Sequence, residues 1–197
     1  MLSLSKISGS GNYYLNLARE DYYLNGGEPP GVWLGSATRH LGLFGKADPS
    51  DVRSLLAGFS PSGVGLVQNA GAENRQCGWD LTFSAPKSVS LLWALGSERE
   101  AREIQAAHFA AVDCAVRYLE AEGCFTRIGR GGTLVESVGV AVCVFEHGTS
   151  RMGDPQLHSH ALLLNVAHRE CGKWGSIDSR PIYDMMMVLG AAYRAEL

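Results

Sequence analysis

Two long segments that favour β-strands, separated by a short turn, constrain the fold of this chain more than any other feature. Residues 133–147 and 157–167 each contain an apolar run. The residues between them, 148–155, include two glycines, an aspartate and a proline, which favour a reversal of the chain. Strands joined by such a turn pair antiparallel, whereas parallel strands need a crossover of about a dozen residues or more. The sequence therefore predicts an antiparallel hairpin.

The other strand signals surround this hairpin and predict an α+β fold. Residues 78–84 alternate between apolar and polar side chains, with Trp79, Leu81 and Phe83 on one face, which is typical of a half-buried strand. Shorter strands are expected at 2–5, 124–129 and 173–177. Because hairpins dominate, we expect an antiparallel central sheet with helices packed on it rather than a parallel, doubly wound sheet.

Helix signals complete one domain spanning residues 1–197. Helices are expected at 49–57, 86–95, 97–122 and 183–197, and residues 24–48 are expected to form a long loop. Asp48 before Pro49, and Ser97 with Glu100, are capping signals for two of these helices. Since the last helical pattern reaches the final residue without a capping signal, we expect the domain to be truncated at its C-terminus.

Three of the six histidines lie on the predicted hairpin and point to a metal site. His158 and His160 are two positions apart on one strand, so their side chains leave the same face about 7 Å apart. His147 lies near the end of the neighbouring strand. Imidazole nitrogens bind metal ions at about 2.1 Å, and three of them leave positions open for substrate or water. We predict that these three hold one ion, and that the others are surface or packing residues: His40, His108 and His168.

Asp80 is a candidate partner for this site. It lies on the strand 78–84, on the face opposite Trp79, Leu81 and Phe83. A carboxylate there can accept a hydrogen bond from a ligating histidine and fix its tautomer, or it can take a proton from a nucleophile. A solvated strand aspartate is the alternative interpretation.

Four of the seven tyrosines lie within eleven positions, as the pairs Tyr13-Tyr14 and Tyr22-Tyr23. A phenol with an ordinary pKa of about 10 is a poor nucleophile unless a base or a cation activates it. A divalent ion that polarises a phosphate can supply that help, and the phosphotyrosine formed preserves the energy of the cleaved linkage. Aromatic packing is the alternative, and the histidine triad is what favours catalysis.

Together these motifs resemble the TrwC/TraI-type (MobF) conjugative relaxases of the HUH endonuclease superfamily. The resemblance extends over essentially the whole chain, and the block from Trp79 to Ser90 is highly specific. The other matching stretches are Gly11-Asn12-Tyr13-Tyr14, Asp21-Tyr22-Tyr23, Phe145-Glu146-His147, Asp154-Pro155-Gln156-Leu157-His158-Ser159-His160 and Tyr193-Arg194-Ala195-Glu196-Leu197.

The resemblance implies a palm-like HUH fold and site- and strand-specific nicking of DNA at a plasmid or mobile-element origin of transfer. A tyrosine would become linked to the DNA 5′ phosphate and leave a free 3′ hydroxyl. Tyr13 matches the primary nucleophile and Tyr22 the second tyrosine, and Tyr14 and Tyr23 can exchange roles with their neighbours. Asp80 matches the aspartate that orients a ligand or assists the nucleophile, and the three hairpin histidines match the metal ligands.

The resemblance also implies a metal and partners. Imidazole ligands favour Mn, Co, Ni, Cu or Zn over Mg, whereas relaxases are discussed with Mg or Mn as working ions, so Zn, Ni or Co are expected only as ions retained on purification. The implied partners are single-stranded or hairpin DNA from the transfer origin, a helicase region in the same full-length protein, and accessory relaxosome and coupling proteins. Three arginines, each of which can equally be a solvated surface charge, are candidates to meet phosphates near the site: Arg127, Arg130 and Arg151.

Composition limits the remaining choices. The net charge of −3 argues against a strongly basic DNA binder, but the excess lies in the predicted helix 97–122, which has six acidic and three basic residues. If that helix covers the back of the sheet, its charge faces away from the substrate. Five cysteines without a C-x-x-C pair disfavour a disulfide framework or a cysteine-based zinc site. No signal peptide or membrane-length apolar run is visible, so we expect a bacterial cytoplasmic protein without membrane insertion.

Two other functions remain open from the sequence. A cupin-like or other metal-dependent hydrolase would use the same histidine triad on a small molecule, with no role for Tyr13 or Tyr22. A non-cleaving module would bind single-stranded or hairpin DNA only. Trapping a covalent protein–DNA adduct distinguishes both from a relaxase.

Overall fold

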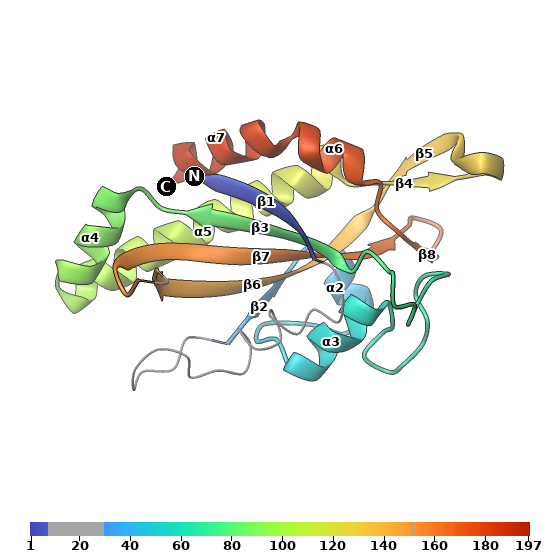
Figure 1. Ribbon diagram of the computed structural model, residues 1–197, viewed down its shortest axis with the longest axis horizontal. Helices are drawn as coiled ribbons and strands as arrows, with labels where there is room; N and C mark the ends of the chain where they lie inside the picture. Colours follow the sequence, from blue (N-terminus) through green and yellow to red (C-terminus); the bar gives the residue numbers. More distant parts are fainter. Residues whose placement is uncertain (8–29, 151) are drawn as a thin grey trace.

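The computed structural model describes residues 1–7, 30–150 and 152–197. Its centre is an antiparallel sheet in which the strands follow the order β1-β3-β7-β6-β2, with β8 paired to β7 (Figure 1). The strands of this sheet are β1 (Leu2–Ile7), β2 (Val32–Leu34), β3 (Gly78–Ser84), β6 (Gly139–Thr149), β7 (Pro155–His168) and β8 (Trp174–Gly175). A separate two-stranded ribbon is formed by β4 (Phe125–Ile128) and β5 (Leu134–Ser137). The predicted α+β class and antiparallel central sheet are confirmed.

The hairpin of β6 and β7 is the longest pairing in the sheet, and its register places the predicted histidines. Thr149 pairs with Pro155 beside the turn, and after a register shift His147 pairs with His158. Because side chains alternate across a strand, His158 and His160 share one face while Leu157 and Ser159 point to the other. The predicted antiparallel hairpin is therefore confirmed, with the histidines beside its turn.

Helices cover both faces of the sheet. They are α2 (Ala37–His40), α3 (Pro49–Ala57), α4 (Lys87–Leu95), α5 (Glu98–Gly123), α6 (Ser179–Asp184) and α7 (Met186–Glu196). Trp79, Leu81 and Phe83 of β3 face α5, α6 and α7, in a core that contains Leu119 and Tyr193. The opposite face packs against α2 and α3. We call the α5–α7 side the back of the sheet and the α2–α3 side its front.

The predicted capping signals are confirmed. The Asp48 side chain accepts a hydrogen bond from the Ser50 amide at the start of α3, with Pro49 in the first turn. Ser97 and Glu100 form a reciprocal capping box at the start of α5. Gly58 ends α3 with φ of 91°, a left-handed conformation that favours glycine.

Three predicted boundaries are wrong. Residues 133–147 are not one strand, because the chain leaves the ribbon at Val138, whose amide donates to Cys124, and enters the central sheet as β6. The expected loop 24–48 contains β2 and α2 within its described part, where Trp33 and Ala37 are buried in the front core. The expected final helix is two helices, α6 and α7, which meet at Met185. The elements that were missed, β2, α2, β5 and α6, are short, so their local patterns were too weak to predict them.

No helix in the described parts of the chain is long and apolar enough to cross a membrane.

Candidate active site

Three histidines meet beside the turn of the β6–β7 hairpin, on the front of the sheet. The ring centres of His147, His158 and His160 lie 5.2, 5.2 and 5.3 Å apart, which is close to an equilateral triangle. His147 is 7% exposed, and the other two are half-buried. Helix α4 packs at this end of the hairpin, where the Trp93 ring leaves no room for a Cβ atom at Gly148. The structure therefore brings together all three predicted ligands.

In two of these rings, the hydrogen bonds leave available the lone pair of the nitrogen that would bind a metal. His158 Nδ1–H donates to the Gln156 carbonyl at 2.9 Å, and His160 Nδ1–H donates to Asp80 Oδ2 at 2.8 Å. A neutral ring that donates from Nδ1 carries its lone pair on Nε2. Burial lowers the pKa of His158 to about 4, so this ring is neutral at ordinary pH. Neutral imidazole is the form that binds metal ions.

The spacing of the triad fits one metal ion, but the side chains as they stand do not form a closed coordination sphere. Three imidazoles bound tetrahedrally at about 2.1 Å would have ring centres about 5 Å apart, as found here. However, no three His, Cys, Asp or Glu side chains in the described residues are placed to hold an ion as they stand. Donor type and spacing fit a metal, and closing the coordination sphere requires the side chains to adjust.

Asp80 occupies the position that the sequence predicted. Its side chain lies on the front of β3, is almost fully buried, and also accepts a hydrogen bond from Thr82 Oγ1 at 3.2 Å. The predicted hydrogen bond between this carboxylate and a triad histidine is confirmed, with His160 as the donor. Such a bond fixes the ring orientation and raises the basicity of the ligand. A role of Asp80 in proton transfer stays a prediction.

The predicted nucleophiles lie outside the described residues. This applies to Tyr13, Tyr14, Tyr22 and Tyr23, and also to Arg151.

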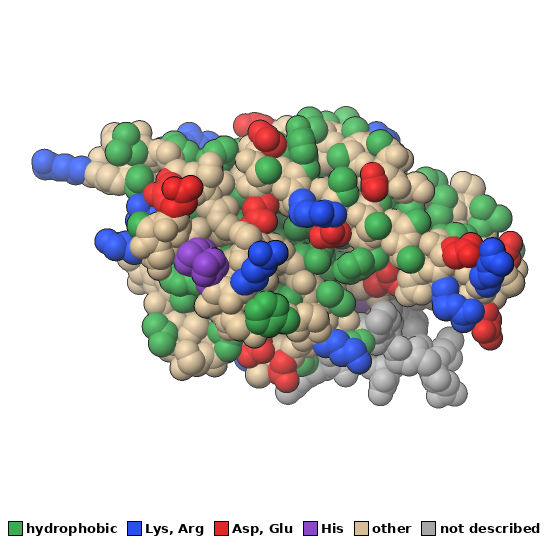
Figure 2. All heavy atoms as spheres, turned by 180° about the vertical axis from the view of Figure 1, so that it is seen from behind, with side chains coloured by type: hydrophobic (Ala, Val, Ile, Leu, Met, Phe, Trp, Pro, Cys, Tyr) green, Lys and Arg blue, Asp and Glu red, His purple; other side chains and the backbone are tan. Residues whose placement is uncertain are grey.

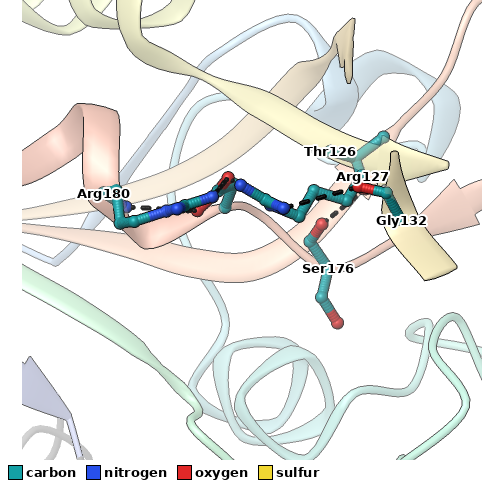
Figure 3. Close-up of polar contacts among 6 residues, drawn as sticks. Thr126, Arg127, Gly132, Ser176 and Arg180 are labelled. Carbon is teal, nitrogen blue, oxygen red and sulfur yellow. Dashed lines mark hydrogen bonds and ion pairs between the residues drawn. The ribbon is translucent and has the colours of Figure 1, made fainter. Parts of the chain in front are cut away.

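The expectation that Arg127 and Arg130 lie near the site is wrong. Both belong to the β4–β5 ribbon, which lies at the opposite end of the sheet from α4 and the triad (Figure 1). There Arg127 Nε donates to Asp178 Oδ2 at 2.7 Å, beside a second contact from Arg180 at 3.1 Å (Figure 3). Arg130 is exposed at the tip of the ribbon. The sequence places both arginines before β6 but does not show that the ribbon projects away from it.

The charged surface of α5 lies on the back, as expected. Arg99–Glu103, Arg102–Glu98 and Arg117–Asp113 are ion pairs between residues four apart along this helix. Figure 2 shows acidic and basic side chains interspersed over this side of the molecule. Glu120 is the exception, because its carboxylate accepts hydrogen bonds from the amides of Ser36 and Val140. The acidic excess therefore does not face the triad.

Sequence reasoning missed a polar group directly behind the triad. His108 of α5 is fully buried, and its two ring nitrogens lie 2.8 Å from Ser159 Oγ and 2.7 Å from Tyr193 Oη. Of the predicted surface or packing role for His108, the structure supports packing, because the side chain is buried. The available signal was the place of His108 on the apolar stripe of the helix, where a polar ring needs partners.

Comparison with known proteins identifies the family. Residues 8–197 match the model of the TrwC relaxase family. The multifunctional conjugation protein TraI of Escherichia coli (strain K12) is 35% identical over 215 residues, which cover 100% of this chain and 12% of that protein. A metal-bound structure of the conjugative relaxase TrwC in complex with OriT DNA superimposes with a TM-score of 0.86 at 33% identity, over 100% of this chain and 68% of that one. A copper-bound TrwC–OriT DNA complex gives 0.83 at 34% identity, with the same coverage.

The family match and the structural match both extend over nearly the full length of the chain. This chain spans about an eighth of the TraI protein that it matches. It belongs to the TrwC relaxase family.

Proposed function

We propose that this chain nicks and rejoins one strand of DNA at an origin of transfer through a covalent 5′-phosphotyrosine intermediate. The observation that carries the proposal is the triad of His147, His158 and His160, with His160 held by Asp80, in a fold that matches TrwC bound to OriT DNA. The alternative, a metal-dependent hydrolase of small molecules, accounts for the triad but not for the structural match to TrwC bound to OriT DNA.

In the proposed reaction, the Tyr13 phenol oxygen attacks the scissile phosphate. The new O–P bond replaces the P–O3′ bond, so the 5′ phosphate stays on the protein. The phenol gives up its proton as it attacks, and the departing 3′ oxygen takes one up. Tyr22 acts in later strand transfer, and Tyr14 and Tyr23 are the alternates within each pair. Asp80 accepts the Nδ1 proton of His160, and the Gln156 carbonyl accepts that of His158, which keeps both Nε2 lone pairs available.

The triad would hold a divalent ion, which supplies polarisation of a phosphate oxygen when it is bound. We propose Mg or Mn as the working ion, with Zn, Ni or Co as ions that the imidazoles can retain. The metal-bound and copper-bound TrwC structures support a metal in this family.

Proposed partners follow from the same family. They are single-stranded or hairpin DNA of the transfer origin, a helicase region within a longer protein, and accessory relaxosome and coupling proteins in the bacterial cytoplasm. Arg151 is a candidate phosphate contact, and Arg127 and Arg130 are candidates only for DNA that reaches the ribbon, away from the triad. The TraI relative, which is described as multifunctional, supports a longer protein.

An adduct trap tests the proposal. The chain is incubated with Mn²⁺ and 3′-labelled single-stranded oligonucleotides, each carrying a hairpin followed by a variable segment. We expect label attached to protein on a denaturing gel, mapped by peptide analysis to Tyr13, and lost in Tyr13→Phe or with EDTA. Tyr22→Phe is the matched control, since it should retain the first cleavage.

Three outcomes would contradict the proposal or part of it. Binding of DNA without an adduct, in this chain and in versions extended past Leu197, would indicate a non-cleaving module. An adduct that forms equally well with EDTA would remove the metal from the mechanism. An adduct that survives in Tyr13→Phe would assign the nucleophile to another tyrosine.

A further inference from the structure

A continuous chain of buried polar side chains runs behind the strand that carries two of the three triad histidines. Ser159 lies between His158 and His160 and points to the back of the sheet. Its Oγ is 2.8 Å from His108 Nε2 on α5, and His108 Nδ1 is 2.7 Å from Tyr193 Oη on α7. All three side chains are completely buried. The β7 strand is thereby connected to two separate helices at the position between the histidines.

Both nitrogens of the His108 ring, at the centre of these hydrogen bonds, have a partner. Burial lowers the pKa of His108 to about 4, so the ring is neutral and carries one N–H donor and one lone-pair acceptor. One hydroxyl therefore donates to the ring and the other accepts from it. Because water is excluded, loss of either partner would leave a buried polar atom unpaired, which is strongly unfavourable. The arrangement is accordingly a fixed one.

The residues that flank the triad are held by helices at two more points. Ser90 of α4, which is fully buried, accepts the Leu157 amide proton at 3.1 Å. On the neighbouring strand, the Gln105 amide of α5 donates to the Glu146 carboxylate, next to His147. Each strand of the hairpin is thus fastened to a helix next to a triad histidine.

We propose that His108 is a positioning residue, which acts through Ser159 to set the direction in which β7 presents His158 and His160. Through Tyr193 the same ring makes this geometry depend on the docking of α7. The physical reason is that metal ligands act only within narrow limits of distance and angle, which neighbouring hydrogen bonds enforce. This inference rests on the proposed metal-binding function of the triad.

Most of the residues that make these hydrogen bonds lie in the sequence blocks that carry the family resemblance. Ser90, Ser159 and Tyr193 all belong to those blocks, and none of them is explained by nucleophile or ligand roles. Positioning gives each of them a function that does not require contact with DNA.

Cobalt binding in the absence of DNA tests the inference. Co²⁺ is titrated into the protein, and its visible absorption reports both affinity and coordination geometry. Ser159→Ala removes one buried hydroxyl, and we expect about ten-fold or weaker binding with an altered spectrum. His108→Asn keeps a polar group near the Nδ1 position, toward Tyr193, and should weaken binding similarly. His108→Gln places its amide near the Nε2 position, toward Ser159, and should restore most of the affinity.

Thr126→Val is the matched control. The Thr126 hydroxyl is also buried and donates to the Ser176 carbonyl at 2.7 Å, but it lies on the distant ribbon (Figure 3). We expect it to bind Co²⁺ like the wild type. Circular dichroism checks that each variant is folded. If a His108 variant does not fold, the Co²⁺ affinity of Ser159→Ala alone tests the positioning role.

The outcomes separate the inference from the proposed function. If the wild type binds no Co²⁺, the proposed metal site fails. If the wild type binds and folded Ser159→Ala binds equally well, with the same spectrum, positioning by His108 is overturned. The inference also fails if Thr126→Val loses as much affinity as Ser159→Ala, because the loss would then reflect general destabilisation.

Discussion

The triad end and the ribbon end of this molecule differ in how deeply their polar side chains are buried. At the triad end, Asp80 and His147 are buried, and the hydrogen bonds of Asp80 are made to other protein groups. At the ribbon end, Arg130 is exposed, and the Arg127 pair with Asp178 is partly open to solvent. Buried polar groups hold one geometry, whereas exposed charges rearrange at little expense. We infer that the triad end is built for fixed chemistry and the ribbon end for adjustable electrostatic contact.

The largest contrast is expected in stability. Phe83 is fully buried behind the triad, with its ring 5.3 Å from that of Tyr193, whereas Leu134 of the ribbon is 60% exposed. Phe83→Ala should lower the free energy of unfolding by about 3–5 kcal/mol, because it removes packing and leaves a cavity. Leu134→Ala should change it by less than about 0.5 kcal/mol. Urea denaturation of both variants measures the difference, and equal losses would contradict the contrast between the two ends.

Metal affinity should separate the two ends next. Asp80→Asn removes the charge that holds His160 Nδ1–H, so we expect Mn²⁺ or Co²⁺ to bind about 10–100-fold more weakly. Asp178→Asn is the matched control. It removes the charge of the carboxylate that pairs with Arg127 of the ribbon, while the amide oxygen can still cap α6. Isothermal titration of both variants measures the effect. An Asp80→Asn protein with wild-type affinity would show that this hydrogen bond does not support the site.

The buried end should also be sensitive to acid. The pKa of His108 is about 4 in the folded protein, lowered by burial first and then by His158 and the N-terminal amine, against about 6.5 when unfolded. The unfolded chain therefore binds the proton first, and stability falls as pH drops from about 6.5 towards 4. This group alone should contribute about 2 kcal/mol of the loss between pH 7 and pH 5. Urea denaturation at both values measures it.

Comparison with His108→Gln isolates this contribution, because His158 titrates in the same direction. We expect the variant to lose less stability than the wild type over the same interval. If the two proteins lose stability in parallel, His108 is not the source of the acid sensitivity.

The sequence predicted the triad end better than the ribbon end, for a physical reason. The alternation of β3 and the register of a short hairpin are local, so the front positions of Asp80, His147 and His158 could be derived from spacing alone. The ribbon required knowledge of where the chain changes sheets at Val138, which depends on a backbone hydrogen bond to Cys124. Likewise, the contact between His108 and Tyr193 joins residues 85 positions apart, and no local pattern predicts such a pair.

The smallest expected effect concerns Arg127, where exposure should make the side chain nearly neutral for stability but visible in DNA binding. Arg127→Ala should change the free energy of unfolding by less than about 1 kcal/mol, because its ion pair with Asp178 is partly exposed. If the ribbon meets phosphates, the same variant should reduce the salt dependence of affinity for a DNA hairpin by about one unit of log–log slope. Arg99→Ala, in an exposed pair on the back of α5, is the control and should leave that slope unchanged. Fluorescence anisotropy at several salt concentrations measures both variants, and an unchanged slope for Arg127→Ala would mean that this arginine serves only to hold Asp178.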